Sequence, residues 1–221
     1  MWDNATITML LEGTRDTLYM TLVSTFFGYV LGLPLGILLA VTDKEGIHPN
    51  SAVYKVLDVI VNITRSIPFL ILMILIMPFT RILVGKTYGT TATIVPLALA
   101  AAPFIARMVE SSLLEVDHGV IEAAQSMGAN LWTIIWKVLL AEARTSLIVG
   151  ATIALGTILG YSAMAGTIGG GGLGDIAMRY GYYRYQADIM IIAVVLLVLL
   201  VQILQVIGTI LSKKLDRRNT R

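Results

Sequence analysis

The residues that could perform acid–base or metal chemistry are few and scattered in this sequence. Its two histidines, His48 and His118, lie in separate polar segments. Neither has the spacing of a metal site or of a base beside a nucleophile. The chain has no cysteine, which excludes disulfides, thiolate metal sites and cysteine nucleophiles. We therefore expect no metal site, no cofactor bound by this chain and no catalytic site of its own.

The glycine-rich run 169–172 could suggest a nucleotide-binding loop. A loop that cradles phosphates needs glycines that lead into a helix with a Lys-Ser/Thr pair. Here Leu173, Gly174 and Asp175 follow the run instead. The sequence therefore predicts a flexible or tightly turning loop and not a nucleotide site.

Arg65 is the charge that most needs an explanation, because it lies inside an apolar block. The polar side chains of this block recur at intervals of three, four and three residues, which places them on one face of a helix. They are Lys55, Asp58, Asn62 and Arg65. A charge at the bilayer centre costs about 3 kcal/mol on insertion scales and needs a partner or water. Arg65 is thus either an interior charge, in a pathway or an ion pair, or an anchor at the cytoplasmic interface.

The segment 119–131 predicts a short helix, a turn and the start of a second helix. Gly128 can adopt the left-handed conformation of the turn, and Asn130 can cap the helix that follows it. The small side chains of Ala123 and Ala124 give the first helix a thin surface. Such a helix can insert into a groove of a partner protein or lie on the lipid surface, and physics alone favours neither.

The composition indicates an integral membrane protein. Of 221 residues, 57% are hydrophobic and 14% charged, and the mean hydropathy is +0.82. Soluble domains carry about a quarter charged residues. Apolar runs of roughly 18 residues or more match the bilayer thickness, and backbone amides in lipid must pair within a helix. The sequence therefore predicts an all-α membrane protein. The net charge of +2 and the dispersed basic residues give no reason to expect a nucleic-acid partner.

Five apolar runs are expected to cross the bilayer within a single transmembrane domain, 1–221. They are 18–41, 57–82, 90–107, 146–165 and 189–211. The N-terminus lacks the features of a cleavable signal peptide, so the first span is expected to act as its own signal.

The lysines and arginines between these runs predict the orientation. One alternating set of segments holds ten of them, namely Lys44, Lys55, Arg107, Lys137, Arg144, Lys213, Lys214, Arg217, Arg218 and Arg221. The other set holds five, namely Arg15, Arg81, Lys86, Arg179 and Arg184. Because positive loops remain inside, we expect the N-terminus outside, with the C-terminus and 119–131 in the cytoplasm.

The segment 119–131 also resembles a known family. Glu122, Ala123 and Ala124, followed after three residues by Gly128, resemble the EAA–G signature of permease subunits in ABC importers. In that family the pattern continues with isoleucine, leucine and proline, where this chain has Val138, Leu140 and Ala141. The missing proline leaves open whether the chain bends before its fourth span.

Three longer stretches narrow the resemblance to the permeases of D/L-methionine importers, the methionine uptake transporter family. They are RSIPFLILM at 65–73, AAAPFIARMVESSLLEVDHGVIEAAQSMGA at 100–129 and GYSAMAGTIGGGGLGDIAMRYGYYRYQ at 160–186. The resemblance implies the five-helix fold of type I ABC importer permeases, in the bacterial cytoplasmic (inner) membrane. It further implies uptake of D- and L-methionine.

The same resemblance implies the partners. They are a second copy of the permease, two cytoplasmic ATPase subunits that bind the ATP and magnesium, and an extracytoplasmic methionine-binding protein. The family's coupling helix would lie within 119–131, with Glu122, Ala123, Ala124 and Gly128 at the ATPase contact.

Tyr161, Ser162 and Met164 are the residues that we expect on the translocation pathway. They combine an aromatic ring, a hydroxyl and a polarizable thioether where the fourth span meets the outer loop. Ordinary helix packing is the alternative.

Three other functions compete with methionine import. The first is import of another amino acid or small solute by the same kind of permease. An ion-coupled secondary transporter should show two related halves and buried acids, but Asp58 is the only acid near a span core. A membrane enzyme is disfavoured because the sequence has no clustered acid–base pair.

Overall fold

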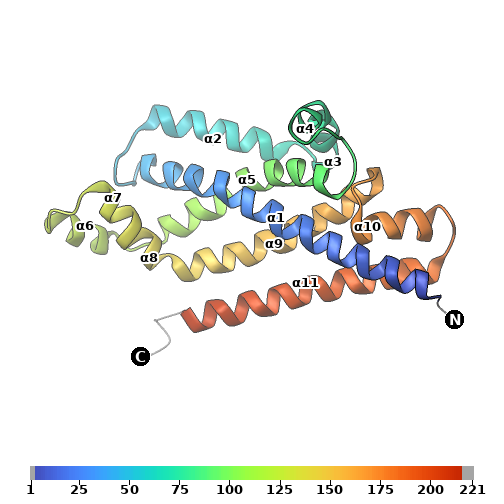
Figure 1. The fold of residues 1–221 in the computed structure, drawn as a ribbon. Helices are drawn as coiled ribbons and strands as arrows, with labels where there is room; N and C mark the ends of the chain where they lie inside the picture. Colours follow the sequence, from blue (N-terminus) through green and yellow to red (C-terminus); the bar gives the residue numbers. More distant parts are fainter. Residues whose placement is uncertain (1–2, 216–221) are drawn as a thin grey trace.

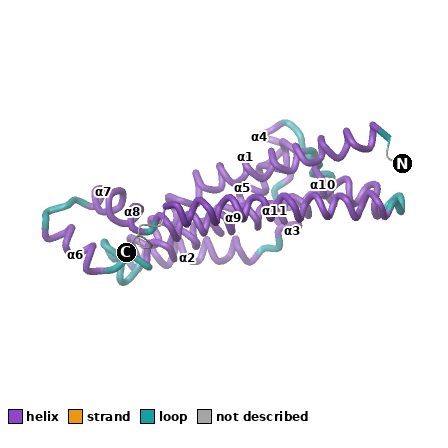
Figure 2. Tube along the Cα trace, turned by 90° about the horizontal axis from the view of Figure 1, so that it is seen from below, coloured by secondary structure: helices purple, strands orange, loops and turns teal. Residues whose placement is uncertain are grey.

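Four long helices form an elongated bundle (Figures 1 and 2). The structure, a computed structural model, describes residues 3–215, and this part of the chain contains helices and no strands. Three basic residues of the orientation count, Arg217, Arg218 and Arg221, lie outside the described residues. The long helices are α1 (Asn4–Thr42), α5 (Thr90–Leu114), α9 (Arg144–Ala165) and α11 (Ala187–Leu215).

The second apolar block is divided among α2 (Ser51–Ser66), α3 (Phe69–Leu75) and α4 (Met77–Val84). The bend between α2 and α3 is 101°. Pro68 causes it, because proline has no amide hydrogen for the helix and forces the preceding residue out of the helical region. Ile67 accordingly has φ −79° and ψ 121°.

The predicted spans lie on these helices. The runs 18–41, 90–107, 146–165 and 189–211 fall within α1, α5, α9 and α11. Over the described residues, four helices are long and apolar enough to cross a bilayer, or five if the bent pair α2–α3 forms one span. The predicted run 57–82 covers most of α2, all of α3 and most of α4.

α1 and α5 pack closely because α1 presents glycines at every fourth position. A Cβ on Gly32 would lie 2.5 Å from the carbonyl oxygen of Ala102, and one on Gly36 would lie 2.5 Å from that of Ala106. Small residues four apart let membrane helices approach backbone to backbone, where van der Waals packing stabilises the pair. α5 supplies buried apolar side chains such as Leu97 to the main core.

One end of the bundle, here named the α6 end, carries the helix–turn–helix and the end of α11 (Figures 1 and 2). Its short elements are α6 (His118–Ser126), α7 (Leu131–Thr133), a π-helical turn (Ile134–Leu139) and α8 (Leu140–Glu142). α1 begins at the opposite end, here named the N-terminal end.

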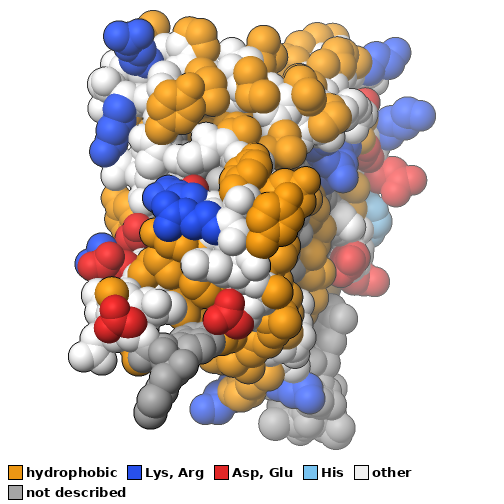
Figure 3. Space-filling model, turned by 90° about the vertical axis from the view of Figure 1, so that its right-hand side faces the viewer, with side chains coloured by type: hydrophobic (Ala, Val, Ile, Leu, Met, Phe, Trp, Pro, Cys, Tyr) orange, Lys and Arg blue, Asp and Glu red, His pale blue; other side chains and the backbone are white. Residues whose placement is uncertain are grey.

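The N-terminal end also carries the glycine-rich run. There a 3₁₀ turn (Gly166–Ile168), α10 (Gly172–Ile176) and a π-helical turn (Ala177–Tyr182) connect α9 to α11. The run is a tight turn fixed by hydrogen bonds, since the amide of Leu173 donates to Thr17 Oγ1 at 2.9 Å and the amide of Gly89 donates to Gly169 O at 2.9 Å. Basic and acidic side chains stand between apolar ones on this end of the molecule (Figure 3), as expected of a surface in water.

Candidate functional site

The helix–turn–helix at the α6 end is built by local capping. Asp117 begins α6 by accepting a hydrogen bond from the amide of Gly119 at 2.8 Å. Gly128 has φ +77°, and its amide donates to Gln125 O at 2.9 Å, which ends the helix in a left-handed turn. Asn130 Oδ1 then accepts from the amide of Thr133 at 2.9 Å, which confirms the predicted cap.

α6 buries Ala124, half-buries Ile121 and exposes its other side chains. Ala124 is 6% exposed and belongs to the main core, while Glu122 and Ala123 are exposed. The exposed large apolar side chains of this region are Val120, Met127, Leu131, Trp132 and Trp136. Aromatic residues and methionine are enriched where proteins bind one another, so this apolar surface is suited to a protein partner.

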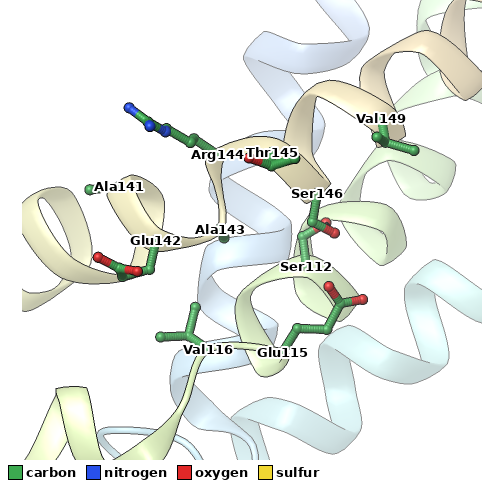
Figure 4. A pocket seen from close by; sticks show the side chains of 10 residues that line it. All are labelled: Ser112, Glu115, Val116, Ala141, Glu142, Ala143, Arg144, Thr145, Ser146 and Val149. Atoms are coloured by element: carbon green, nitrogen blue, oxygen red, sulfur yellow. The ribbon is translucent and has the colours of Figure 1, made fainter. Parts of the chain in front are cut away.

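Beside the helix–turn–helix lies a hollow with a volume of about 510 Å³ (Figure 4). It lies where the end of α5 meets the turn between α8 and α9 at Ala143. Ser146 and Ser112 join the two walls by a hydroxyl–hydroxyl hydrogen bond of 3.0 Å. Its charged lining is mixed, because Glu115 and Glu142 are acidic and Arg144 is basic.

A cluster of polar side chains joins α2 to α5. Arg107 forms ion pairs with Asp58 and with Glu110 Oε2, the latter at 2.7 Å. Arg107 Nη2 also donates to Asn62 Oδ1 at 3.0 Å, and the hydroxyl of Tyr54 donates to Glu110 Oε1 at 3.0 Å. Glu110 is 4% exposed, so its charge depends on these partners. Two residues of the predicted polar stripe, Asp58 and Asn62, therefore face protein, whereas Lys55 at its start is exposed.

The structure separates the three residues that were predicted on the pathway. Tyr161 stacks on Phe69, with ring centroids 4.8 Å apart and an interplanar angle of 2°. Ser162 is 1% exposed, and its hydroxyl donates to Leu159 O of its own helix at 2.7 Å. Met164 is 47% exposed. Arg65 lies near Tyr161, because both line one small cavity between α2, α3, α5 and α9.

Arg107, Glu110 and Tyr54 are the residues of the polar cluster that the sequence did not indicate. Arg107 was counted only as a loop charge, and Tyr54 has no charge to draw attention. The one available signal was the polar stripe, because Asp58 and Asn62 in an apolar block require polar partners. Nothing in their spacing identifies a partner 49 residues away.

Metal-ligating side chains do not gather anywhere in residues 3–215. No group of three or more His, Cys, Asp or Glu side chains in this part of the chain could hold an ion. His48 and His118 accordingly do not belong to a metal-binding cluster of the described residues.

Comparison with known proteins identifies the family. A model of the family described as "Binding-protein-dependent transport system inner membrane component" matches residues 32–221. The chain belongs to this family. It is 51% identical over 210 residues to the probable D-methionine transport system permease protein MetI of Vibrio cholerae. This match covers 95% of this chain and 93% of that protein.

Solved structures agree with this assignment. A chain of the MetNI methionine ABC transporter, determined in inward-facing conformations, matches with a TM-score of 0.96 and 49% identity, over 98% of this chain and 100% of that one. A chain of an amino acid ABC transporter determined with histidines shares the fold, with a TM-score of 0.74 at 18% identity over 95% of this chain and 93% of that one. The predicted all-α fold of ABC importer permeases is confirmed.

The turn before α9 lies close to the position where importer permeases usually carry a proline. The sequence left this turn in doubt because Ala141 replaces the proline usual in importer permeases. The chain nevertheless turns at Ala143, which has φ −77° and ψ −2° and follows the π-helical turn (Figure 4). The permease therefore changes direction here without a proline.

Proposed function

We propose that this chain is the transmembrane permease subunit of an ATP-binding-cassette importer and forms the membrane pathway for D- and L-methionine. The observation that carries the proposal is the 51% identity along 95% of the chain to a protein named as a D-methionine transport system permease. Identity over 95% of the chain includes the core and the helix–turn–helix, so it concerns the permease chain as a whole and not one segment.

In the proposed orientation the N-terminal end lies outside the cell, and the α6 end and the C-terminus lie in the cytoplasm. The support is the excess of lysine and arginine in the segments assigned to the cytoplasm, ten against five. The two ends of the bundle would then meet different partners, a binding protein outside and an ATPase inside.

α6 would be the coupling helix that docks in a groove on the ATPase. Its exposed face supplies Glu122 and Ala123, and the chain leaves the helix in a left-handed turn at Gly128. The exposed apolar side chains Met127 and Trp132 would be covered by the ATPase. This favours a protein groove over a lipid surface, although tryptophan also suits a membrane interface.

The buried side of α6 would transmit motion. Ala124 belongs to the same core cluster as Ile134, Ile135 and Leu139, which lie on the π-helical turn that leads through α8 to α9. A displacement of α6 would therefore act on α9 through packed side chains, and closely packed interiors transmit such strain.

The complete importer would contain two copies of this chain, two ATPase subunits and an extracytoplasmic methionine-binding protein. ATP and magnesium would bind to the ATPase, and this chain would have no catalytic site of its own. Substrate would pass between the two permease copies, with Tyr161, Ser162 and Met164 near the outer end of α9 on or beside its path.

Uptake by vesicles that contain the purified complex tests the proposal. Labelled L- and D-methionine should accumulate when the binding protein is outside and ATP inside, and should not accumulate with a non-hydrolysable ATP analogue. Uptake of a different amino acid in place of methionine would support the alternative importer. Uptake driven by an ion gradient without ATP would instead indicate a secondary transporter.

A further inference from the structure

A small cavity with one charged wall lies where α2 breaks into α3. Its volume is about 210 Å³, and its walls come from α2, α3, α5 and α9. Pockets for drug-sized ligands measure about 300–1,000 Å³, so this cavity is of a size for a smaller molecule. Arg65 and Thr64 supply its polar side, and Phe69, Leu72, Phe104 and Tyr161 supply its apolar side.

The cavity lies part-way along the bundle and is open on the side of Arg65, whose side chain is exposed. Arg65 is fourteen residues from the start of α2 and Tyr161 is seventeen from the start of α9, which places them about 21 and 26 Å along helices that rise 1.5 Å per residue. The hydrocarbon core is about 30 Å thick. The non-helical backbone at Ile67 and Pro68 is tolerated at membrane depth where it is buried in protein or lines a wet cavity.

Arg65 has a charge to satisfy at this depth. Within residues 3–215 its guanidinium forms no ion pair, in contrast to Arg107, which has two. The side chain is exposed in the single chain and is therefore open to a ligand. An arginine at membrane depth requires an anionic partner or water, and the guanidinium fork matches a carboxylate with two parallel hydrogen bonds.

The remaining walls match the rest of an apolar α-amino acid. Thr64 donates its hydroxyl hydrogen to Ile60 O at 2.8 Å, which leaves the oxygen lone pairs free to accept from an ammonium group. The last turn of α2 adds the negative end of a helix dipole, which also favours a cation. Phe69 and Tyr161 are stacked, and rings of this kind make favourable contacts with a thioether.

The geometry points to a substrate-binding site inside the membrane, in which Arg65 binds the carboxylate of an apolar α-amino acid. Thr64 faces the ammonium group, and Phe69, Phe104 and Tyr161 contact the apolar side chain. The inference rests on the proposed function, since it gives the imported amino acid a resting place between the outer face and the cytoplasm. It also assigns Arg65 to the interior and not to the cytoplasmic interface.

Ligand-induced stabilisation of the purified full-length complex, without the binding protein, tests this site. The probes are millimolar methionine and methioninol, which keeps the ammonium group and thioether but lacks the carboxylate. A ligand that binds the folded state raises the unfolding temperature. Methionine should raise it in the wild type and methioninol should not.

Substitutions assign the effect to the cavity. Arg65→Gln should weaken methionine binding on the order of tenfold or more, because it removes a hydrogen-bonded charge partner. Arg65→Lys keeps the charge without the planar fork and should give an intermediate loss. Arg81→Gln is the matched control, because Arg81 is exposed on α4 away from this cavity, and it should bind as the wild type.

Two results would overturn the site. One is methioninol binding as tightly as methionine. This comparison uses the wild-type protein alone, so it tests the carboxylate contact even if Arg65→Gln does not accumulate. The other is Arg65→Gln binding methionine unchanged. Failure of the proposed function looks different, namely wild-type vesicles without ATP-driven methionine uptake. Absence of both uptake and a carboxylate-dependent shift would reject both proposals.

Discussion

Arg107 of α5 and Asp58 of α2 form an ion pair although 49 residues separate them in the chain. The pair joins α2 to α5 on the side of the bend that leads toward the α6 end. Because Glu110 is bound to the same guanidinium and is 4% exposed, one arginine holds two acidic groups in the protein. α2 and α5 are therefore expected to move together when the permease changes conformation.

Arg107→Ala should destabilise the protein strongly. Removing one partner of a buried ion pair leaves an uncompensated charge and costs about 3–5 kcal/mol. Thermal unfolding of the purified protein measures the loss. Arg179→Ala is the matched control, because the pair of Arg179 with Asp175 has an arginine side chain that is 57% exposed, and such pairs contribute about 0–1 kcal/mol. Equal losses in the two variants would contradict a structural role for Arg107.

Gly36→Ala should separate α1 from α5. Its Cβ would lie 2.5 Å from Ala106 O and 2.6 Å from Val109 Cβ, so the helices must move apart, at about 1–3 kcal/mol for overpacking. Gly156→Ala is the control within another long helix, since among residues 3–215 its Cβ would meet only Gln205 Nε2 at 3.8 Å. We expect Gly156→Ala to unfold at or above the wild-type temperature, because alanine is the better helix former. A normal unfolding temperature for Gly36→Ala would show that the helices can shift freely.

The long helices could be predicted because backbone amide and carbonyl groups in lipid must form their hydrogen bonds within a helix. Local capping could be predicted because it depends on residues that are neighbours in the sequence. Gly128 and Asn130 are such local cases. Asp117 was missed as a cap although aspartate is a preferred capping residue, so α6 begins earlier than expected. Pro68 is a proline within the apolar run 57–82, but the size of the bend that follows, 101°, depends on how α3 packs.

The pathway residues could not be grouped from sequence for a geometric reason. Tyr161, Ser162 and Met164 lie within one helical turn, where successive side chains point in directions about 100° apart. One cavity therefore cannot meet both Tyr161 and Ser162, whereas Met164 lies on the same face as Tyr161 but one turn closer to the N-terminal end. Tyr161 lines the cavity beside Arg65, Ser162 is buried against its own helix, and Met164 is exposed. Their partners come from other helices, which local spacing does not reveal.

The orientation of the chain can be tested with single cysteines, because the natural sequence has none. Asn4→Cys and Tyr183→Cys should react with an impermeant thiol reagent on intact cells, while Asn219→Cys should react only after lysis. Tyr183 is 65% exposed, whereas Gly172 in the same region has φ +74° and would place a Cβ 2.6 Å from Thr17 Oγ1, so a cysteine there would be strained. Labelling of Asn219→Cys in intact cells without labelling of Asn4→Cys would reverse the orientation and exclude the importer model.

Substitutions at the helix–turn–helix test the coupling assignment. Gly128 is the most informative position, because its backbone conformation disfavours a side chain while its surroundings leave room for one. The left-handed φ of +77° disfavours a β-branched side chain, while a Cβ added to Gly128 would have no heavy atom of residues 3–215 within 4 Å, its chain neighbours aside. Gly128→Val should therefore insert in the membrane and form dimers, yet lose ATP-driven methionine uptake and co-purify with less ATPase. Asparagine tolerates the left-handed region, so Gly128→Asn should retain much of the transport.

Glu122→Lys tests the same contact through charge instead of backbone conformation. It should insert normally, since Glu122 is exposed in the middle of α6, outside its first turn, and exposed substitutions usually change stability by no more than about 0.5 kcal/mol. It should nevertheless lose transport, because Glu122 is exposed at the proposed ATPase contact. Membrane abundance, ATPase co-purification and uptake are measured on the same preparations as for Gly128→Val. Normal uptake by both variants would remove α6 from the coupling role, as would loss of either protein from the membrane.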